Sequence, residues 1–189
     1  MRRGRQKSRC GRPPSGVLGV KNQKPAFRVF TKELGSDWSL PFSICGKRNE
    51  EKTMKNGFLK VAVTTPDLRV ADCEYNKNQM VEKVKKMAGE KVSLVCFPEF
   101  SLTGYTCGDL FLHDTLVEGA KDALAAYCEE TKSYEIVSVV GLPLDHNGKL
   151  YNVAAVIYGG KILGFVPKSY LPNYSEFYEA RQFVEAPAE

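Results

Sequence analysis

A nearly continuous apolar run, Val92-Ser93-Leu94-Val95-Cys96-Phe97, leads directly into Pro98-Glu99-Phe100-Ser101-Leu102-Thr103-Gly104-Tyr105. A run of this kind predicts a strand that is buried on both faces. Glu99 then stands where the strand gives way to a loop, which is where α/β proteins tend to place working side chains. Lys168 repeats the pattern, because it follows a proline at the end of the apolar run 161–166. The sequence therefore predicts a carboxylate and an ammonium group at the ends of two strands.

Strands and helices alternate around the first of these runs. The segment 58–65 is rich in β-branched residues and stops at Pro66, as a strand leaving a sheet would. Asp72 can cap a helix that ends near Gly89, and a second helix is predicted to start at Asp114. Their apolar positions follow helical spacing: Met80, Val81, Val84, Met87 and Ala88 in the first, and Val117, Ala120, Leu124 and Tyr127 in the second. Lys121, Asp122, Glu129 and Glu130 are interpreted as a solvated face.

Three strands without intervening helices follow, at 136–142, 151–158 and 161–166. Asn147-Gly148 predicts a tight hairpin turn, and Gly159-Gly160 joins the last two strands. The predicted fold class is α/β, with a βαβα unit followed by a β-meander and helices on the outer face of a mixed sheet.

Charge divides the chain into two parts. Residues 1–53 carry 13 Lys and Arg against 4 Asp and Glu, whereas residues 54–189 carry 14 against 18. The first part shows no sustained hydrophobic period, so we expect a basic, disordered extension at 1–53 and one domain at 54–189. A nucleic-acid-binding arm and a targeting peptide are alternatives for the extension, but the absence of interleaved aromatics weighs against nucleic acid. We favour an upstream extension without a selected function, since Met54 would itself make a natural start.

Metal and membrane sites are not predicted. Six cysteines fall at scattered spacings, and no Cys-x-x-Cys pair or Cys/His cluster suggests zinc. No apolar stretch approaches 18 residues, so the chain is expected to be cytoplasmic.

Neither Glu99 nor Lys168 alone indicates a catalytic site, since a lone loop carboxylate is more often a hydrogen-bond acceptor or a helix cap. The two residues together are more specific. The two motifs resemble those of the nitrilase, or carbon–nitrogen hydrolase, superfamily, whose members use a Glu-Lys-Cys triad. The segments 104–112 and 172–179 look most like the N-terminal glutaminase domain of glutamine-dependent NAD synthetases. The resemblance runs from about Gly57 to the C-terminus and implies an incomplete nitrilase-like α-β-β-α sandwich.

The resemblance also implies a role for each site residue. Glu99 would be the general base, and Lys168 would stabilise the oxyanion and lower the pKa of the nucleophilic thiol. Glu176 matches a second glutamate that many members keep beside the triad. Tyr105 and Tyr174 look like residues that line the glutamine pocket, with Phe177 and Glu179 as further candidates. Ordinary packing is the alternative role for these four side chains.

The family places its nucleophilic cysteine well after Lys168, where this sequence has none. The chain therefore resembles a domain truncated before its nucleophile, and Cys107 is interpreted as a loop cysteine. In the family, ammonia from glutamine passes to a separate synthetase domain, which uses ATP and magnesium to amidate nicotinic acid adenine dinucleotide to NAD. No phosphate-binding loop occurs here, so we expect no cofactor in this chain. A homo-oligomer is also implied.

Three functions remain open. The first is the glutaminase part of a glutamine-dependent NAD synthetase, inactive by itself. The second is a catalytically dead nitrilase-like binding or oligomerisation module. The third is a nucleic-acid binder that acts through its basic arm.

Overall fold

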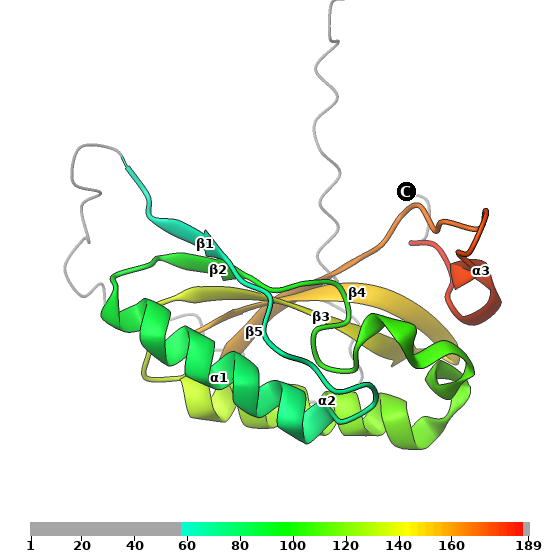
Figure 1. The fold of residues 1–189 in the computed structure, drawn as a ribbon, viewed down its shortest axis with the longest axis horizontal. Helices are drawn as coiled ribbons and strands as arrows, with labels where there is room; N and C mark the ends of the chain where they lie inside the picture. The colour runs from blue at the N-terminus through cyan, green and yellow to red at the C-terminus, as the bar shows by residue number, and fades with distance from the viewer. Residues whose placement is uncertain (1–57, 187–189) are drawn as a thin grey trace, which may run out of the picture.

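One mixed β-sheet organises the protein. A computed structural model describes residues 58–186, and the predicted disordered extension at 1–53 lies outside that range. Within it, a five-stranded sheet has the order β1-β2-β3-β4-β5, and two long helices lie against one of its faces (Figure 1). The predicted mixed α/β architecture is confirmed.

The strands change from parallel to antiparallel at the centre of the sheet. β1 (Val61–Val63), β2 (Leu94–Cys96) and β3 (Val137–His146) pair in parallel. β4 (Lys149–Tyr158) and β5 (Lys161–Pro167) continue the sheet in antiparallel fashion. The two connections made by helices therefore give parallel neighbours, and the two tight turns give antiparallel neighbours, as chain connectivity requires.

The helices begin and end close to their sequence signals. α1 (Cys73–Gly89) is capped by Asp72, whose side chain accepts a hydrogen bond from the Tyr75 amide at 3.0 Å, and Gly89 is its last residue. α2 (Asp114–Thr131) starts where the sequence predicts. The apolar positions Met80, Val84, Ala120, Leu124 and Tyr127 are fully buried. The amphipathic pattern thus determines which face of each helix covers the sheet.

One residue of the predicted solvated face of α2 has a structural role. Glu130 accepts a hydrogen bond from Lys77 of α1, whose side chain is almost completely buried. This ion pair joins the two helices. The helical period identifies the outward face correctly but does not show which outward residues meet a neighbouring helix.

The predicted hairpin turns are present. Asn147 and Gly148 both have positive φ, 55° and 70°, as a tight turn between right-twisted strands requires. Gly159 and Gly160 have φ values of 57° and 74°. These turns fix the register of the meander, in which Pro143 lies opposite Asn152 and Val153 lies opposite Pro167.

The prediction that 92–97 is a strand buried on both faces is partly wrong. β2 has only three residues, and Leu94 and Cys96 are half-buried whereas Val95 is fully buried. β1 is likewise shorter than the predicted 58–65, and Val63 is 84% exposed. The reason is that α1 and α2 cover one face of the sheet, and no other described helix covers the second.

Candidate functional site

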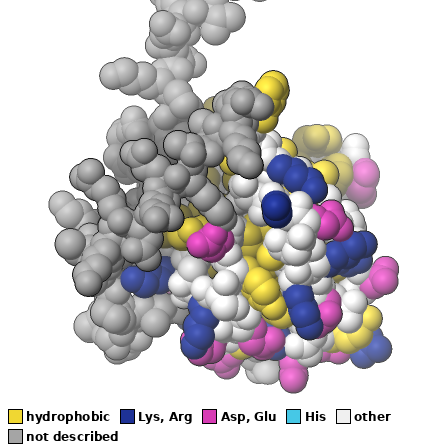
Figure 2. Space-filling view, turned by 90° about the vertical axis from the view of Figure 1, so that its left-hand side faces the viewer, with side chains coloured by type: hydrophobic (Ala, Val, Ile, Leu, Met, Phe, Trp, Pro, Cys, Tyr) yellow, Lys and Arg dark blue, Asp and Glu magenta, His cyan; other side chains and the backbone are white. Residues whose placement is uncertain are grey.

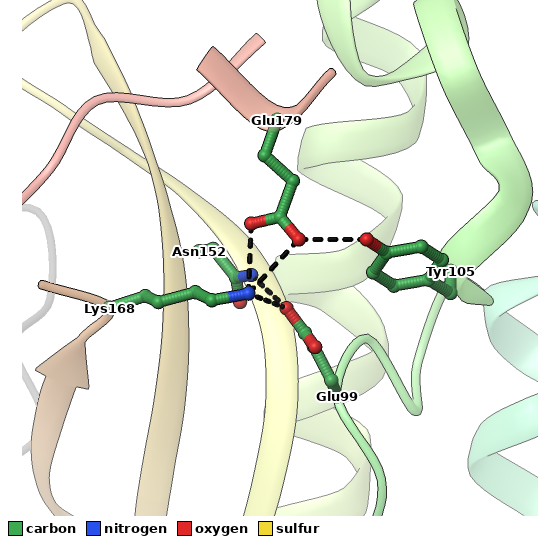
Figure 3. Close-up of polar contacts among 5 residues, drawn as sticks. All are labelled: Glu99, Tyr105, Asn152, Lys168 and Glu179. Atoms are coloured by element: carbon green, nitrogen blue, oxygen red, sulfur yellow. Dashed lines mark hydrogen bonds and ion pairs between the residues drawn. The ribbon is translucent and has the colours of Figure 1, made fainter. Parts of the chain in front are cut away.

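Glu99 and Lys168 meet at one edge of the sheet. The parallel strand β2 and the antiparallel strand β5 end at this edge, and β4 begins there, so the residues after β2 and β5 lie close together. Lys168 Nζ donates a hydrogen bond to Glu99 Oε1 at 2.8 Å (Figure 3). The prediction that these two side chains form an ion pair is confirmed, although they are 69 residues apart in sequence.

The loop that carries Glu99 rests directly on β3. A Cβ atom at Gly141 would lie 2.5 Å from the Phe100 nitrogen and 2.7 Å from the Pro98 carbonyl oxygen, so only glycine fits. The Ser101 hydroxyl accepts a hydrogen bond from the Gly141 amide at 3.2 Å. Phe100 has a φ of 52°, an uncommon conformation for a bulky residue, and its side chain is buried. Close backbone contact therefore fixes the position of Glu99.

Lys168 lies between two carboxylates. Besides its bond to Glu99, Nζ is 3.0 Å from Glu179 Oε1 and 2.9 Å from Glu179 Oε2. Burial alone lowers the pKa of the Lys168 ammonium, but the hydrogen bonds to Glu99 and Glu179 outweigh it and the net pKa is raised. Lys168 is therefore held as a cation that faces a carboxylate on each side.

Tyr105 extends the cluster from the second carboxylate. Its hydroxyl donates to Glu179 Oε1 at 2.8 Å, and the Glu179 side chain is only 7% exposed (Figure 3). Burial and this hydrogen bond raise the pKa of Tyr105, which keeps the phenol protonated and able to donate. Tyr105 begins η2 (Tyr105–Leu112), and Glu179 begins the short helix α3 (Glu179–Gln182).

Apolar and polar contacts hold α3 over the site. Phe183 packs on Phe100 and Phe111, with ring centroids 5.1 Å and 5.0 Å away. Arg181 donates to both oxygens of Asp109 in η2, at 2.8 Å and 2.9 Å. These contacts join α3 to the loop that carries Glu99 and to the segment that carries Tyr105.

The structure places Glu179, and not Glu176, beside Lys168. Glu176 is exposed and forms no hydrogen bond or ion pair within residues 58–186. The chain turns at Ser175, which has a φ of 53°, and the Glu179 amide then donates to the Pro172 carbonyl. Glu179 is thus the glutamate that contacts Lys168. The role predicted for Glu176 beside the triad stays a prediction, and its negative charge contributes to the raised pKa of Tyr105.

The other predicted pocket residues are divided between the cluster and the surface. Tyr105 and Glu179 belong to the cluster, as described above. Tyr174 is 68% exposed and packs on the half-buried Phe177 at 5.7 Å between ring centroids, and neither is bonded to Lys168. Their roles in binding glutamine stay predictions.

Asn152 is a site residue that the sequence interpretation missed. It lies in β4 and is buried, and its side-chain amide donates to Glu99 Oε1 (Figure 3). The signal was present in the sequence, since Asn152 is the one polar residue in the run 151–157. A buried polar side chain needs a partner, so an amide in such a run points to one.

No described thiol contacts the cluster. Cys107 is buried and donates to the Thr103 and Gly104 carbonyls at 3.2 Å and 3.4 Å, and burial raises its pKa. Burial also raises the pKa of Cys73 and of Cys128 to about 11. Cys96 is half-buried and lies against its neighbour's carbonyl. Cys107 is thus a packed cysteine of η2, and the described residues bring together carboxylates and an ammonium group with no thiol in contact with them.

A separate hollow lies at the opposite end of the sheet. It has a volume of about 750 Å³ and lies near the start of β2, whereas Glu99 follows the end of that strand. Figure 2 faces this end of the molecule and shows charges of both signs mixed with small hydrophobic patches. The lining residues are Lys85, Ala88, Gly89, Lys91, Val92, Ser93, Ser133, Tyr134 and Glu135. None of the five residues drawn in Figure 3 lines this hollow.

Two further findings concern metals and membranes. Between residues 58 and 186, no group of three or more His, Cys, Asp or Glu side chains is arranged to hold a metal ion. None of the helices in the same range is long and apolar enough to cross a membrane.

Comparisons with known proteins identify the family of the chain and support its fold. The carbon–nitrogen hydrolase family model matches residues 60–186. The glutamine-dependent NAD(+) synthetase of Mycobacterium tuberculosis is 38% identical over 135 residues, which are 71% of this chain and 20% of that protein. A crystal structure of a glutamine-dependent NAD(+) synthetase from Cytophaga hutchinsonii has a TM-score of 0.65 and 28% identity, covering 68% of this chain and 22% of that one.

A more distant structure supports the fold alone. An amidase of the nitrilase superfamily from Nesterenkonia has a TM-score of 0.58 at 18% identity, over 69% of this chain and 49% of that one. The chain spans about one fifth of the length of the curated relatives that it matches. Because the family model covers most of the chain, this protein belongs to the carbon–nitrogen hydrolase family.

Proposed function

We propose that this chain supplies the base and the cation of a glutaminase that delivers ammonia for NAD synthesis. The observation that carries the proposal is the position of Lys168 Nζ, 2.8 Å from Glu99 and 2.9 Å from Glu179. Relatives that match most of the described residues are glutamine-dependent NAD(+) synthetases, which supports glutamine as the substrate. The comparisons favour neither the binding-module nor the nucleic-acid alternative.

Amide hydrolysis requires a nucleophile, a proton carrier and positive charge at the developing oxyanion. Glu99 would take the proton of a thiol, whose sulfur attacks the side-chain carbonyl carbon of glutamine. The tetrahedral oxyanion would form near Lys168, and Glu99 would return the proton to the leaving ammonia. Water would then hydrolyse the thioester to glutamate. The thiol is expected from the part of the relatives' length that this chain does not span.

Two carboxylates around one ammonium have different tasks in this proposal. Glu99 is 40% exposed and can reach a substrate, whereas Glu179 is buried and bonded to both Lys168 and Tyr105. Glu179 would therefore hold Lys168 in place and keep it charged while Glu99 exchanges a proton. ATP and magnesium would act in a separate synthetase domain, and the described residues offer no cluster for a metal, so no step here is assigned to either.

A chimera tests the proposal. The part of this chain that matches the M. tuberculosis synthetase over 135 residues would replace its counterpart in that protein, and NAD formation would be measured with glutamine and with ammonia. Glu99→Gln and Lys168→Met should each lower the glutamine-supported rate by at least about 10³-fold while the ammonia-supported rate persists. The matched control is Glu118→Gln, which removes an exposed ion pair with Lys121. Equal glutamine-supported rates in the chimera and in both site variants would contradict the proposal.

We also propose that the chain works in the cytoplasm as part of a homo-oligomer, as its resemblance to this family implies. Analytical ultracentrifugation of the purified chain tests the second point. A single monomeric species at all accessible concentrations would count against it.

A further inference from the structure

The carboxylate of Glu99 is bonded unevenly. Both of its hydrogen-bond donors, the Lys168 ammonium and the Asn152 amide, meet the same oxygen, Oε1 (Figure 3). Oε2 accepts no hydrogen bond from any residue between 58 and 186. One side of the carboxylate is thus fully engaged and the other is free.

Asn152 is positioned to impose this arrangement. It is only 5% exposed, whereas the Glu99 side chain is 40% exposed, so the amide holds the carboxylate from the protein interior. The main-chain carbonyl of Asn152 also accepts a hydrogen bond from the main-chain amide of Lys168 at 2.8 Å. One residue of β4 therefore fixes the side chain of Glu99 and the backbone of Lys168.

We propose that Asn152 is a positioning residue that reserves Oε2 of Glu99 as the atom that takes and returns the proton. This inference rests on the proposed glutaminase function. A carboxylate oxygen that accepts two donors, one of them charged, is a weaker base than the free oxygen beside it. The neutral amide of Asn152 forms a hydrogen bond with Oε1 and adds no charge to the cluster, which already contains the carboxylates of Glu99 and Glu179 and the ammonium group of Lys168.

A simpler role for Asn152 is that of a buried amide satisfied by the nearest acceptor. Asn76 shows what this looks like, since it is fully buried and its amide donates only to the main-chain carbonyls of Arg69 and Leu102, at 2.8 Å and 3.0 Å. Asn76 therefore serves as an internal control. Its amide signals should not respond to the ionisation of Glu99.

The first test is an NMR titration of the whole 189-residue chain, following the assigned side-chain amide signals of both asparagines. The Asn152 signals should move with pH as Glu99 titrates, and this movement should be lost in Glu99→Gln and kept in Glu176→Gln. Asn76 should stay unchanged. If the pH dependence of the Asn152 signals is the same in Glu99→Gln as in the native chain, the inference is overturned. This result does not depend on catalysis or on the folding of an Asn152 variant.

The second test uses Asn152→Ala in the chimera described above. Misplacement of the base should lower glutamine-supported kcat by about 10²-fold with little change in KM. An unchanged kcat would overturn the positioning role. Retention of activity in Glu99→Gln would instead refute the proposed function, whatever the NMR result.

Discussion

The strand ends and the segment 169–186 build the two sides of the site by different means. Glu99, Asn152 and Lys168 are fixed by strands that pair through the centre of the sheet. The later segment contains only the four-residue helix α3, and Tyr170, Tyr174 and Tyr178 are exposed along it. Its position depends on the buried residues Glu179 and Phe183, on the ion pair between Arg181 and Asp109, and on main-chain hydrogen bonds from Val184 to Leu150 and from Ala186 to Lys168. Substitutions in the core should therefore disturb Glu99, Asn152 and Lys168 by lowering the stability of the whole fold. Substitutions in the segment 169–186 should disturb only the contacts of that segment.

A substitution in the core should lower the free energy of unfolding much more than a substitution in the segment 169–186. Leu124 is fully buried beneath the sheet, and Leu124→Ala should lower the free energy of unfolding by about 2–5 kcal/mol. Tyr174→Ala removes a larger but exposed side chain and should change it by less than about 0.5 kcal/mol. Urea denaturation followed by circular dichroism measures both. Equal losses would show that the segment is part of the cooperative core.

Gly141→Ala should displace the loop that carries Glu99 from β3. The new methyl group would lie 2.5 Å from a backbone nitrogen, so the loop that carries Glu99 would have to move. Overpacking of this kind costs about 1–3 kcal/mol. Gly119→Ala is the matched control, because its Cβ would meet only the Cys73 sulfur at 4.0 Å and alanine favours a helix. Similar unfolding curves for the two variants would contradict the close approach at Gly141.

The contribution of the Lys168 charge to the stability of the fold should depend on pH only in alkaline solution. The pKa of Lys168 is raised in the folded chain, so its stabilising contribution is fully present below its unfolded pKa of about 10.4 and is lost as pH rises through the folded value. The difference in stability between the native chain and Lys168→Met should therefore shrink above about pH 10.4. Cys73 and Cys128 ionise in the same range but in both proteins equally. A difference that stays constant to high pH would show that Lys168 is not held by the carboxylates.

The smallest expected effect concerns the link between α3 and η2. Asp109 and Arg181 are both exposed, so Asp109→Asn should leave the thermal midpoint almost unchanged. Hydrogen exchange at the Phe183 amide, which donates to the Glu179 carbonyl at 2.8 Å, should nevertheless become faster. Glu118→Gln again provides the control. Unchanged exchange would mean that the aromatic contacts of Phe183 hold α3 without the ion pair.

Local signals predicted most of the fold. Helical periodicity, the Asp72 cap and the Asn147-Gly148 turn act over a few residues, so the sequence contains them completely. The second face of β2 could not be predicted in this way, because its burial depends on what covers the sheet and not on the strand itself.

The site was only partly predictable. The sequence places Glu99 and Lys168 after two predicted strands, and the resemblance to the carbon–nitrogen hydrolase family implied that their side chains meet. The choice between Glu176 and Glu179 depends on a turn with positive φ at Ser175, a serine that carries no strong turn signal. Gly141 acts through a close approach to a loop distant in sequence, which single-sequence patterns do not reveal. For Asn152 the pattern marks a buried polar side chain but does not identify its partner, Glu99.

Ammonia release from glutamine by the purified 189-residue chain tests whether Glu99 and Lys168 lack a nucleophile in this chain. Glu99 and Lys168 are in place, but the buried thiols of Cys73, Cys107 and Cys128 have raised pKa values, and none contacts either residue. Since no thioester can form without a thiol beside Glu99 and Lys168, we expect no ammonia above background. Sustained release that Cys107→Ala abolishes would contradict it, because the base and the cation would then already have their nucleophile.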